Sequence, residues 1–222
     1  MTCCNSRRKP EWLKIKLPKG QSSTEVLNIV RKHNLHTICT SGMCPNQGEC
    51  WGNRTATFMI GGDVCTRSCK FCNVKTGRPA PLDPAEPENI ANSVKLLGLK
   101  HAVITSVDRD DLADLGAAHW VKVIEAVKRV NPETTMEVLI PDFQGRRELV
   151  QQVIEARPEV ISHNLETVRE LSDGVRSRAK YDTSLQVIRQ VSESGIVSKS
   201  GIMLGLGETR EQILRTMDDL LA

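Results

Sequence analysis

One loop of the sequence runs Gly61-Gly62-Asp63-Val64-Cys65-Thr66-Arg67-Ser68-Cys69-Lys70-Phe71-Cys72 and contains three cysteines at the spacing Cys-x3-Cys-x2-Cys. A four-iron cluster takes four thiolate ligands, one for each iron. Three thiolates from one short loop leave one iron open, and an open iron can bind a small molecule. The spacing therefore favours a reactive iron–sulfur cluster on Cys65, Cys69 and Cys72. The paired glycines predict a tight turn where a strand ends.

Zinc is the alternative ligand for this loop. A Cys-x2-Cys pair is common in structural zinc sites, which close with a fourth cysteine or histidine. The next histidine after Cys72 is His101, too far along the chain for a local site. Arg67 and Lys70 stand between the cysteines, and we expect their charges to offset that of a cluster. We expect Phe71 to shield the cluster from water.

A second triplet lies upstream, with Cys39, Cys44 and Cys50 at the spacing Cys-x4-Cys-x5-Cys. Gly42 and Pro45 indicate a turning loop that can curl around an ion or a cluster. Two triplets so close in the sequence are a stronger signal than either alone. Zinc stays open for this triplet taken by itself.

Length and composition indicate one substantial globular domain in a reducing compartment. The chain has 222 residues, of which 39% are hydrophobic and 26% charged. A net charge of +3 and 3% aromatic residues argue against nucleic acid as a partner. There is no apolar run of about 20 residues and no secretory signal, so we expect no membrane span. Eight cysteines in such a protein favour metal or redox chemistry over disulfides.

From residue 56 the pattern alternates between strand and helix. The expected strands are 56–60, 101–107, 135–140, 160–164 and 199–204, and the expected helices begin near 84, 117, 146, 183 and 209. Five such units predict an α/β fold, a partial (β/α) barrel of parallel strands with right-handed crossovers. We divide the chain into an N-terminal extension, residues 1–55, with a short helix opened by Ser22, and a barrel, residues 56–222.

Polar residues cluster where these strands end. The cysteine loop, residues 65–72, follows the first strand, Ser106 and Asp108 follow the second, Asn164 and Glu166 the fourth, and residues 205–208 the fifth. Chemistry in such folds gathers at the C-terminal ends of the strands, so the coincidence favours an enzyme over a set of ordinary turns.

These motifs carry a resemblance. The Cys65 triplet, with an aromatic residue before its last cysteine, resembles the radical S-adenosylmethionine enzymes, and residues 201–208 resemble their glycine-rich segment near adenine. The Cys39 triplet narrows the match. Together with residues 61–67, 105–111, 163–167 and 199–201, it is similar to the lipoyl synthase family from about Arg8 to the last residue.

The resemblance implies two 4Fe-4S clusters and S-adenosylmethionine as cofactors. The cluster on Cys65, Cys69 and Cys72 would cleave S-adenosylmethionine to a 5′-deoxyadenosyl radical, using an electron from a ferredoxin or flavodoxin. The radical would abstract hydrogen from carbons 6 and 8 of an octanoyl group carried on a lysine. The cluster on Cys39, Cys44 and Cys50 would donate two sulfur atoms, which makes the enzyme a sulfurtransferase. The expected contacts to S-adenosylmethionine are Asn164, Glu166, Ser106, Lys199, Gly205 and Glu208.

The partners implied are octanoylated lipoyl carrier domains, such as the glycine cleavage H protein and the acyltransferase component of 2-oxoacid dehydrogenases. The short N-terminus favours the cytoplasm. One departure stands out: the family's Arg-Ser-Ser-Tyr segment, whose serine is the fourth ligand of the second cluster, is absent. We therefore expect a C-terminally truncated chain that holds the Cys65 cluster but inserts sulfur weakly or not at all.

Two other functions remain open on sequence grounds. One is a different radical enzyme, such as a methylthiotransferase or a biotin-synthase-like sulfur inserter. The other is a zinc-binding interaction module without catalytic activity. The Cys-x4-Cys-x5-Cys loop discriminates against the first, and a brown, iron-rich protein would exclude the second.

Overall fold

The computed structural model describes residue 28, residues 36–52 and residues 55–222. Its main sheet has the strand order β1-β2-β5-β6-β7-β8. The strands are β1 (His36–Thr37), β2 (Thr57–Ile60), β5 (His101–Ser106), β6 (Thr135–Leu139), β7 (Val160–Ser162) and β8 (Val197–Lys199). Neighbouring strands from β2 to β8 are parallel, which confirms the five predicted parallel strands. Strand β1 was not predicted, and it pairs with β2 in the antiparallel direction.

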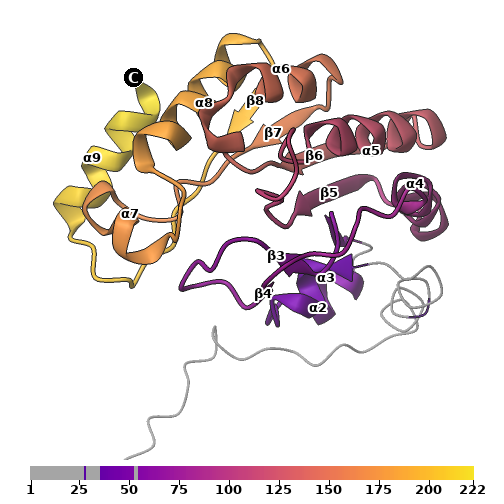
Figure 1. Cartoon of the computed structure of the whole chain (residues 1–222), viewed down its shortest axis with the longest axis horizontal. Coiled ribbons are helices and arrows are strands. Elements are labelled where there is room, and N and C mark those ends of the chain that lie inside the picture. The colour runs from indigo at the N-terminus through magenta and orange to yellow at the C-terminus, as the bar shows by residue number, and fades with distance from the viewer. Residues whose placement is uncertain (1–27, 29–35, 53–54) are drawn as a thin grey trace, which may run out of the picture.

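One or two helices follow each parallel strand along the chain, as the alternating pattern predicted (Figure 1). They are α4 (Glu86–Leu97), α5 (Ala117–Val130), α6 (Arg147–Glu155), α7 (Arg169–Val175), α8 (Tyr181–Glu193) and α9 (Arg210–Leu221). The predicted capping box of the last helix is confirmed, because the Thr209 side chain accepts from the backbone of Gln212 and the Gln212 side chain accepts from that of Thr209. The helix predicted from Ser22 falls outside the described residues.

The fifth predicted strand begins and ends earlier than expected. Residues 199–204 were predicted, whereas β8 covers Val197–Lys199, opposite Val160–Ser162 of β7. The ladder breaks because β7 ends at Ser162, and pairing resumes only as a single bridge between Glu166 and Ile202. The chain then turns through Gly205 and Gly207, both with positive φ.

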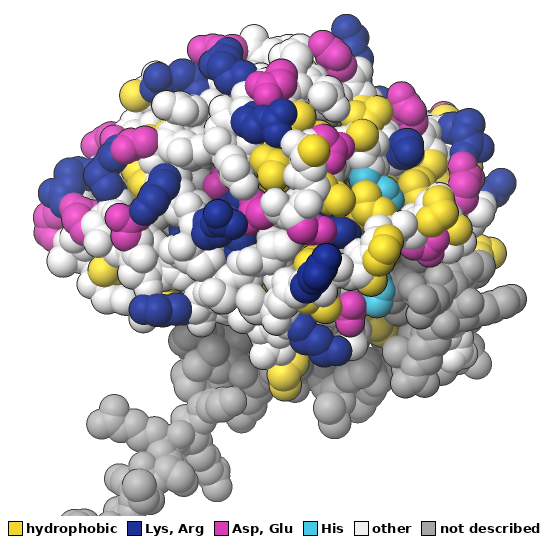
Figure 2. All heavy atoms as spheres, in the orientation of Figure 1, with side chains coloured by type: hydrophobic (Ala, Val, Ile, Leu, Met, Phe, Trp, Pro, Cys, Tyr) yellow, Lys and Arg dark blue, Asp and Glu magenta, His cyan; other side chains and the backbone are white. Residues whose placement is uncertain are grey.

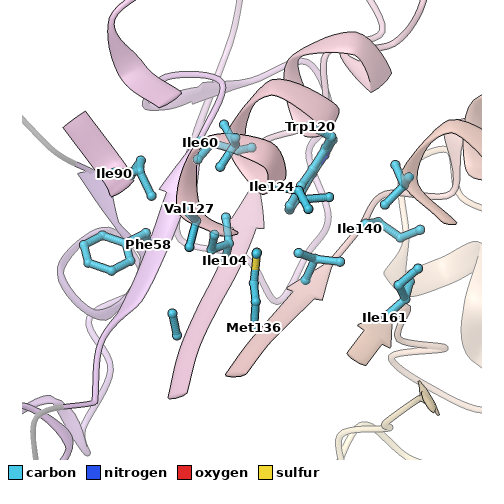
Figure 3. Packing of buried hydrophobic residues seen from close by; sticks show 14 of the residues in the cluster. Phe58, Ile60, Ile90, Ile104, Trp120, Ile124, Val127, Met136, Ile140 and Ile161 are labelled. Atoms are coloured by element: carbon cyan, nitrogen blue, oxygen red, sulfur yellow. The ribbon is translucent and has the colours of Figure 1, made fainter. Parts of the chain in front are cut away.

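The core lies between the sheet and helices α4, α5, α6 and α8. Alternate residues of the strands face the helices, so Met136 and Val138 of β6 are buried there. Trp120 and Ile124 of α5 are also buried in this cluster (Figure 3). Each such large side chain contributes about 1.5–3 kcal/mol on full burial. The opposite face of the sheet carries residues such as Leu139, which line the pocket described below.

Two smaller units complete the fold. Strands β3 (Val64–Cys65) and β4 (Lys75–Thr76) pair in parallel and enclose the cysteine loop, while α2 (Ile38–Ser41) and α3 (Gln47–Gly52) carry the upstream triplet. Figure 1 shows all four elements gathered below the sheet.

The charged side chains on the surface are mixed in sign. Figure 2 shows basic and acidic side chains interspersed over the visible face. In the described part of the chain, no helix is both long enough and apolar enough to span a bilayer.

Candidate active site

A pocket of about 280 Å³ lies at the C-terminal ends of the parallel strands. Three of the four polar clusters predicted from the sequence line it. Among the lining residues are Cys65, Cys69, Cys72, Ser106, Asp108, Asn164 and Glu166. Loops that are far apart in the sequence therefore converge on one cavity, because the C-terminal ends of parallel strands meet at one edge of the sheet.

The three cysteines of the loop differ in their exposure to solvent. Cys65 is buried, Cys69 is half-buried and Cys72 is exposed. The backbone N–H groups of Arg67 and Asp108 donate to the Cys65 Sγ at 3.4 and 3.3 Å. Burial raises the pKa of Cys65 to about 11, so the thiol keeps its proton at neutral pH until a metal displaces it. The two N–H donors suit a metal-bound thiolate, whose negative charge they stabilise.

Within residues 28, 36–52 and 55–222, no three His, Cys, Asp or Glu side chains are placed so as to hold one metal ion. A four-iron cluster takes its cysteines at separate corners, one for each iron. Cys65, Cys69 and Cys72 stay the predicted ligands of such a cluster.

The upstream triplet lies beside this loop. The Asn73 side chain, next to Cys72, donates to the backbone carbonyl of Ser41 at 3.0 Å. Burial raises the pKa of Cys50, and the thiols of Cys39 and Cys44 and the carboxylate of Glu49 raise it further. The two predicted cluster loops are thus in direct contact.

Arg67 does not play the part expected from the sequence. Its guanidinium is buried at the same pocket as the thiols and binds carboxylates from two other loops. It pairs with Asp110 through two hydrogen bonds of 2.8 Å, with Asp142 at 2.9 Å and with Asp108 at 3.4 Å. Its charge is therefore balanced by the protein, and it ties the cysteine loop to the ends of β5 and β6.

The Gly61-Gly62 turn is held by groups that the sequence did not reveal. Both glycines have positive φ, as predicted. The Glu86 carboxylate of α4 accepts from the Gly61 N–H at 2.9 Å, and the Arg109 Nη1 donates to the Gly61 carbonyl at 3.0 Å. His119 of α5 bonds to the same carboxylate at 2.5 Å. No local signal marks these residues, because they lie on helices and loops distant in sequence.

Glu166 shows the backbone strain expected of a functional position. Its φ is +66°, in the left-handed region that non-glycine residues seldom adopt. Burial raises the pKa of its carboxyl group, while Asn164 and Arg176 act to lower it. Both Glu166 and Asn164 line the pocket, in agreement with their proximity in the sequence.

The remaining expected contacts do not line this pocket. Lys199 binds the Glu137 carboxylate at 2.7 and 3.0 Å. The Glu208 carboxylate accepts from the backbone N–H groups of Gly205 and Leu206, at 2.5 and 2.8 Å, and thereby closes its own loop.

Replacing Lys199 with methionine is expected to lower the free energy of unfolding by about 1 kcal/mol, because the half-exposed lysine is only a partly screened partner for Glu137. Burial acts to raise the pKa of Glu137, and Lys199 and Ser162 lower it below its usual range, so the variant should also raise that pKa. Denaturant titration and NMR titration measure the two effects. An unchanged Glu137 pKa would contradict the ion pair.

Comparisons with known proteins agree with this site. A family model described as the Radical SAM superfamily matches residues 59–220. A lipoyl synthase of Treponema denticola is 69% identical over 220 residues, which are 99% of this chain and 75% of that protein. A lipoyl synthase of Parabacteroides distasonis is 64% identical over 96% of this chain and 76% of its own length. The chain thus spans about three quarters of these relatives.

Solved structures share the fold at low sequence identity. The FeFe-hydrogenase maturase HydG from Carboxydothermus hydrogenoformans matches with a TM-score of 0.62 at 14% identity, over 88% of this chain and 52% of that one. Methylornithine synthase PylB matches with a TM-score of 0.58 at 15% identity, over 90% of this chain and 61% of the other.

Proposed function

Because the chain belongs to the lipoyl synthase family, we propose that its pocket is where two sulfur atoms are inserted at carbons 6 and 8 of a protein-bound octanoyl-lysine. The enzyme is a radical S-adenosylmethionine sulfurtransferase, and its cofactors are 4Fe-4S clusters and S-adenosylmethionine. The observation that carries the proposal is the contact between two cysteine loops, one of which opens into the pocket.

Cys65, Cys69 and Cys72 are the proposed ligands of the radical-generating cluster. Held by these three thiolates, such a cluster would supply the electron that cleaves the sulfonium of S-adenosylmethionine. The protein's own contribution is to position the cysteine loop and to exclude water from the pocket. The ion pairs of Arg67 hold the cysteine loop against the ends of β5 and β6. Met59 and Leu139 give the pocket an apolar wall, which disfavours water. The proposed polar contacts to S-adenosylmethionine within this pocket are Asn164, Glu166 and Ser106. The other proposed contacts, which do not line the pocket, are Lys199, Gly205 and Glu208.

Cys39, Cys44 and Cys50 are the proposed ligands of the second cluster, the source of both sulfur atoms. A sulfur donor must lie close to the carbon that receives it. The hydrogen bond from Asn73 to Ser41 supports this placement. We keep the functional division of the chain near residue 55 as part of the same proposal.

The substrates are lipoyl carrier proteins. We propose the glycine cleavage H protein and the acyltransferase component of 2-oxoacid dehydrogenases as the carriers, a ferredoxin or flavodoxin as the reductant, and the cytoplasm as the compartment.

The test uses an octanoylated carrier domain incubated anaerobically with the reconstituted chain, S-adenosylmethionine and dithionite. Mass spectrometry should show a gain of two sulfur atoms, with the first appearing before the second. A methylthio group on the carrier in place of the two inserted sulfur atoms would contradict the proposal.

A further inference from the structure

Ser177 places a hydroxyl group beside one thiol of the cysteine loop. Its Oγ lies 3.9 Å from the Cys69 Sγ, within hydrogen-bonding range of sulfur, and either atom can donate while the thiol carries its proton. A thiolate has no proton and can only accept. A cysteine binds a metal as the thiolate, so in the metal-bound state the Ser177 hydroxyl is the donor of this pair.

The proton of the Ser177 hydroxyl is available for this bond. The Oγ accepts from the Ser68 backbone N–H at 3.1 Å, which occupies one lone pair of the oxygen and leaves the O–H free to donate. In the part of the chain that the structure describes, the hydroxyl has no hydrogen-bond partner other than Ser68 and Cys69. Its proton can therefore point at the sulfur without giving up another acceptor.

The segment that carries Ser177 also holds the backbone on both sides of Cys69. The Lys70 N–H donates to the Val175 carbonyl at 2.9 Å, and the Ser68 N–H donates to Ser177. These two bonds flank Cys69 in the sequence. The thiol and the hydroxyl are therefore placed relative to each other by two short backbone segments that lie side by side.

Hydrogen bonds to the sulfurs are one of the factors that set the reduction potential of an iron–sulfur cluster. A donor stabilises the reduced cluster more than the oxidised one, because the reduced cluster carries one more negative charge. Cys65 accepts from two backbone N–H groups, those of Arg67 and Asp108, which a side-chain substitution does not remove. The donor at Cys69 belongs to a side chain, so its effect can be measured by substitution.

We propose that the Ser177 hydroxyl donates a hydrogen bond to the Cys69 thiolate and thereby raises the reduction potential of the radical-generating cluster. This inference rests on the proposed function, which assigns Cys69 to that cluster. Ser177 acts through Cys69 and touches no reacting atom, so it is a positioning residue and not a catalytic one. A higher potential makes the cluster easier to reduce by the electron donor of the reaction.

The test is a reductive titration of the anaerobically reconstituted chain, followed by electron paramagnetic resonance. The relevant signal is the one that remains in a chain without the upstream triplet. Ser177→Ala is expected to lower the equilibrium constant for reduction by about two- to tenfold, the effect of one hydrogen bond, which is a potential lower by about 20–60 mV. The matched control is Ser68→Ala, which removes an exposed hydroxyl beside Cys69 and keeps the backbone N–H that Ser177 accepts. It should change the constant by less than about 1.5-fold, or about 10 mV.

A second pair of variants separates the hydrogen bond from the shape of the side chain. Ser177→Thr keeps the hydroxyl, whereas Ser177→Val has a methyl group in its place on a side chain of the same shape. The threonine variant should keep the potential of the unmodified chain, and the valine variant should show the shift of Ser177→Ala. Amide hydrogen exchange at Ser68 reports the loss of the accepting oxygen, which is the structural role of Ser177.

Equal potentials for the threonine and valine variants would overturn the inference. So would an unchanged potential in Ser177→Ala together with faster exchange at Ser68, because Ser177 would then only hold the loop. Ser177 is exposed, so we expect its variants to fold, which circular dichroism and iron counts check. An unmodified chain that assembles no cluster on the cysteine loop would instead remove the proposed function beneath the inference.

Discussion

Replacing Cys69 with alanine is expected to abolish the cleavage of S-adenosylmethionine and leave the fold intact. Cys69 is half-buried, and its neighbours Ser68 and Lys70 keep the loop attached to the segment around Ser177 through their backbone N–H groups. The variant loses one proposed thiolate of the radical-generating cluster and none of these attachments. The yield of 5′-deoxyadenosine should fall by about 1,000-fold or more, equivalent to about 4 kcal/mol in the activation barrier.

The matched control is Cys44→Ala in the upstream triplet, which is also half-buried. It should keep the cleavage of S-adenosylmethionine and lose sulfur transfer, because the two triplets are proposed to serve separate steps. Loss of cleavage in both variants to the same extent would show that the loops form one centre, against the assignment of two.

Replacing Arg67 with methionine should lower the free energy of unfolding by about 3–5 kcal/mol, the usual cost of removing one partner from a buried ionic network. The variant would leave Asp142, whose side chain is 4% exposed, without this cation, and would leave Asp110, 6% exposed, with only the solvent-exposed Arg178 at 3.4 Å. Denaturant titration at neutral pH measures the loss. The matched control is Arg215→Met, whose ion pair with Glu170 is exposed and should cost less than about 1 kcal/mol.

The same variant has a defined pH dependence. Burial acts to raise the pKa of Asp110, but the hydrogen bonds from Arg67 and Gln144 lower it to about 2. A lowered pKa in the folded state contributes stability above the unfolded value near 4, and that contribution is lost as the pH falls toward 2. The stability difference between the two chains should therefore be largest at neutral pH and shrink in acid. A constant difference would argue that Arg67 acts through packing alone.

Much of the fold follows from local pattern. The alternation of strands and helices is set by apolar spacing, and the last helix by the chemistry of Thr209 and Gln212, which needs no knowledge of the rest of the chain. Helix α7 (Arg169–Val175) was missed because it is short and buries little apolar surface, so it leaves no periodic signal. Strand β8 was misplaced because its limits depend on where β7 ends.

Part of the site could also be predicted from the sequence, and part depends on the tertiary structure. The two cysteine triplets could be predicted from the sequence because the three cysteines of each lie within one short stretch of the chain. Arg67 was assigned to the cluster because its carboxylate partners come from two other strand ends, and only the tertiary structure brings them to it.

The most direct test is a count of iron and acid-labile sulfide after anaerobic reconstitution, with electron paramagnetic resonance of the reduced protein. We predict about eight irons and eight sulfides per chain, and about four of each when either triplet is replaced by alanine, since each triplet is proposed to hold one four-iron cluster. Material that binds zinc alone, or that keeps all eight irons after replacement of Cys39, Cys44 and Cys50, would contradict the assignment of one cluster to each loop.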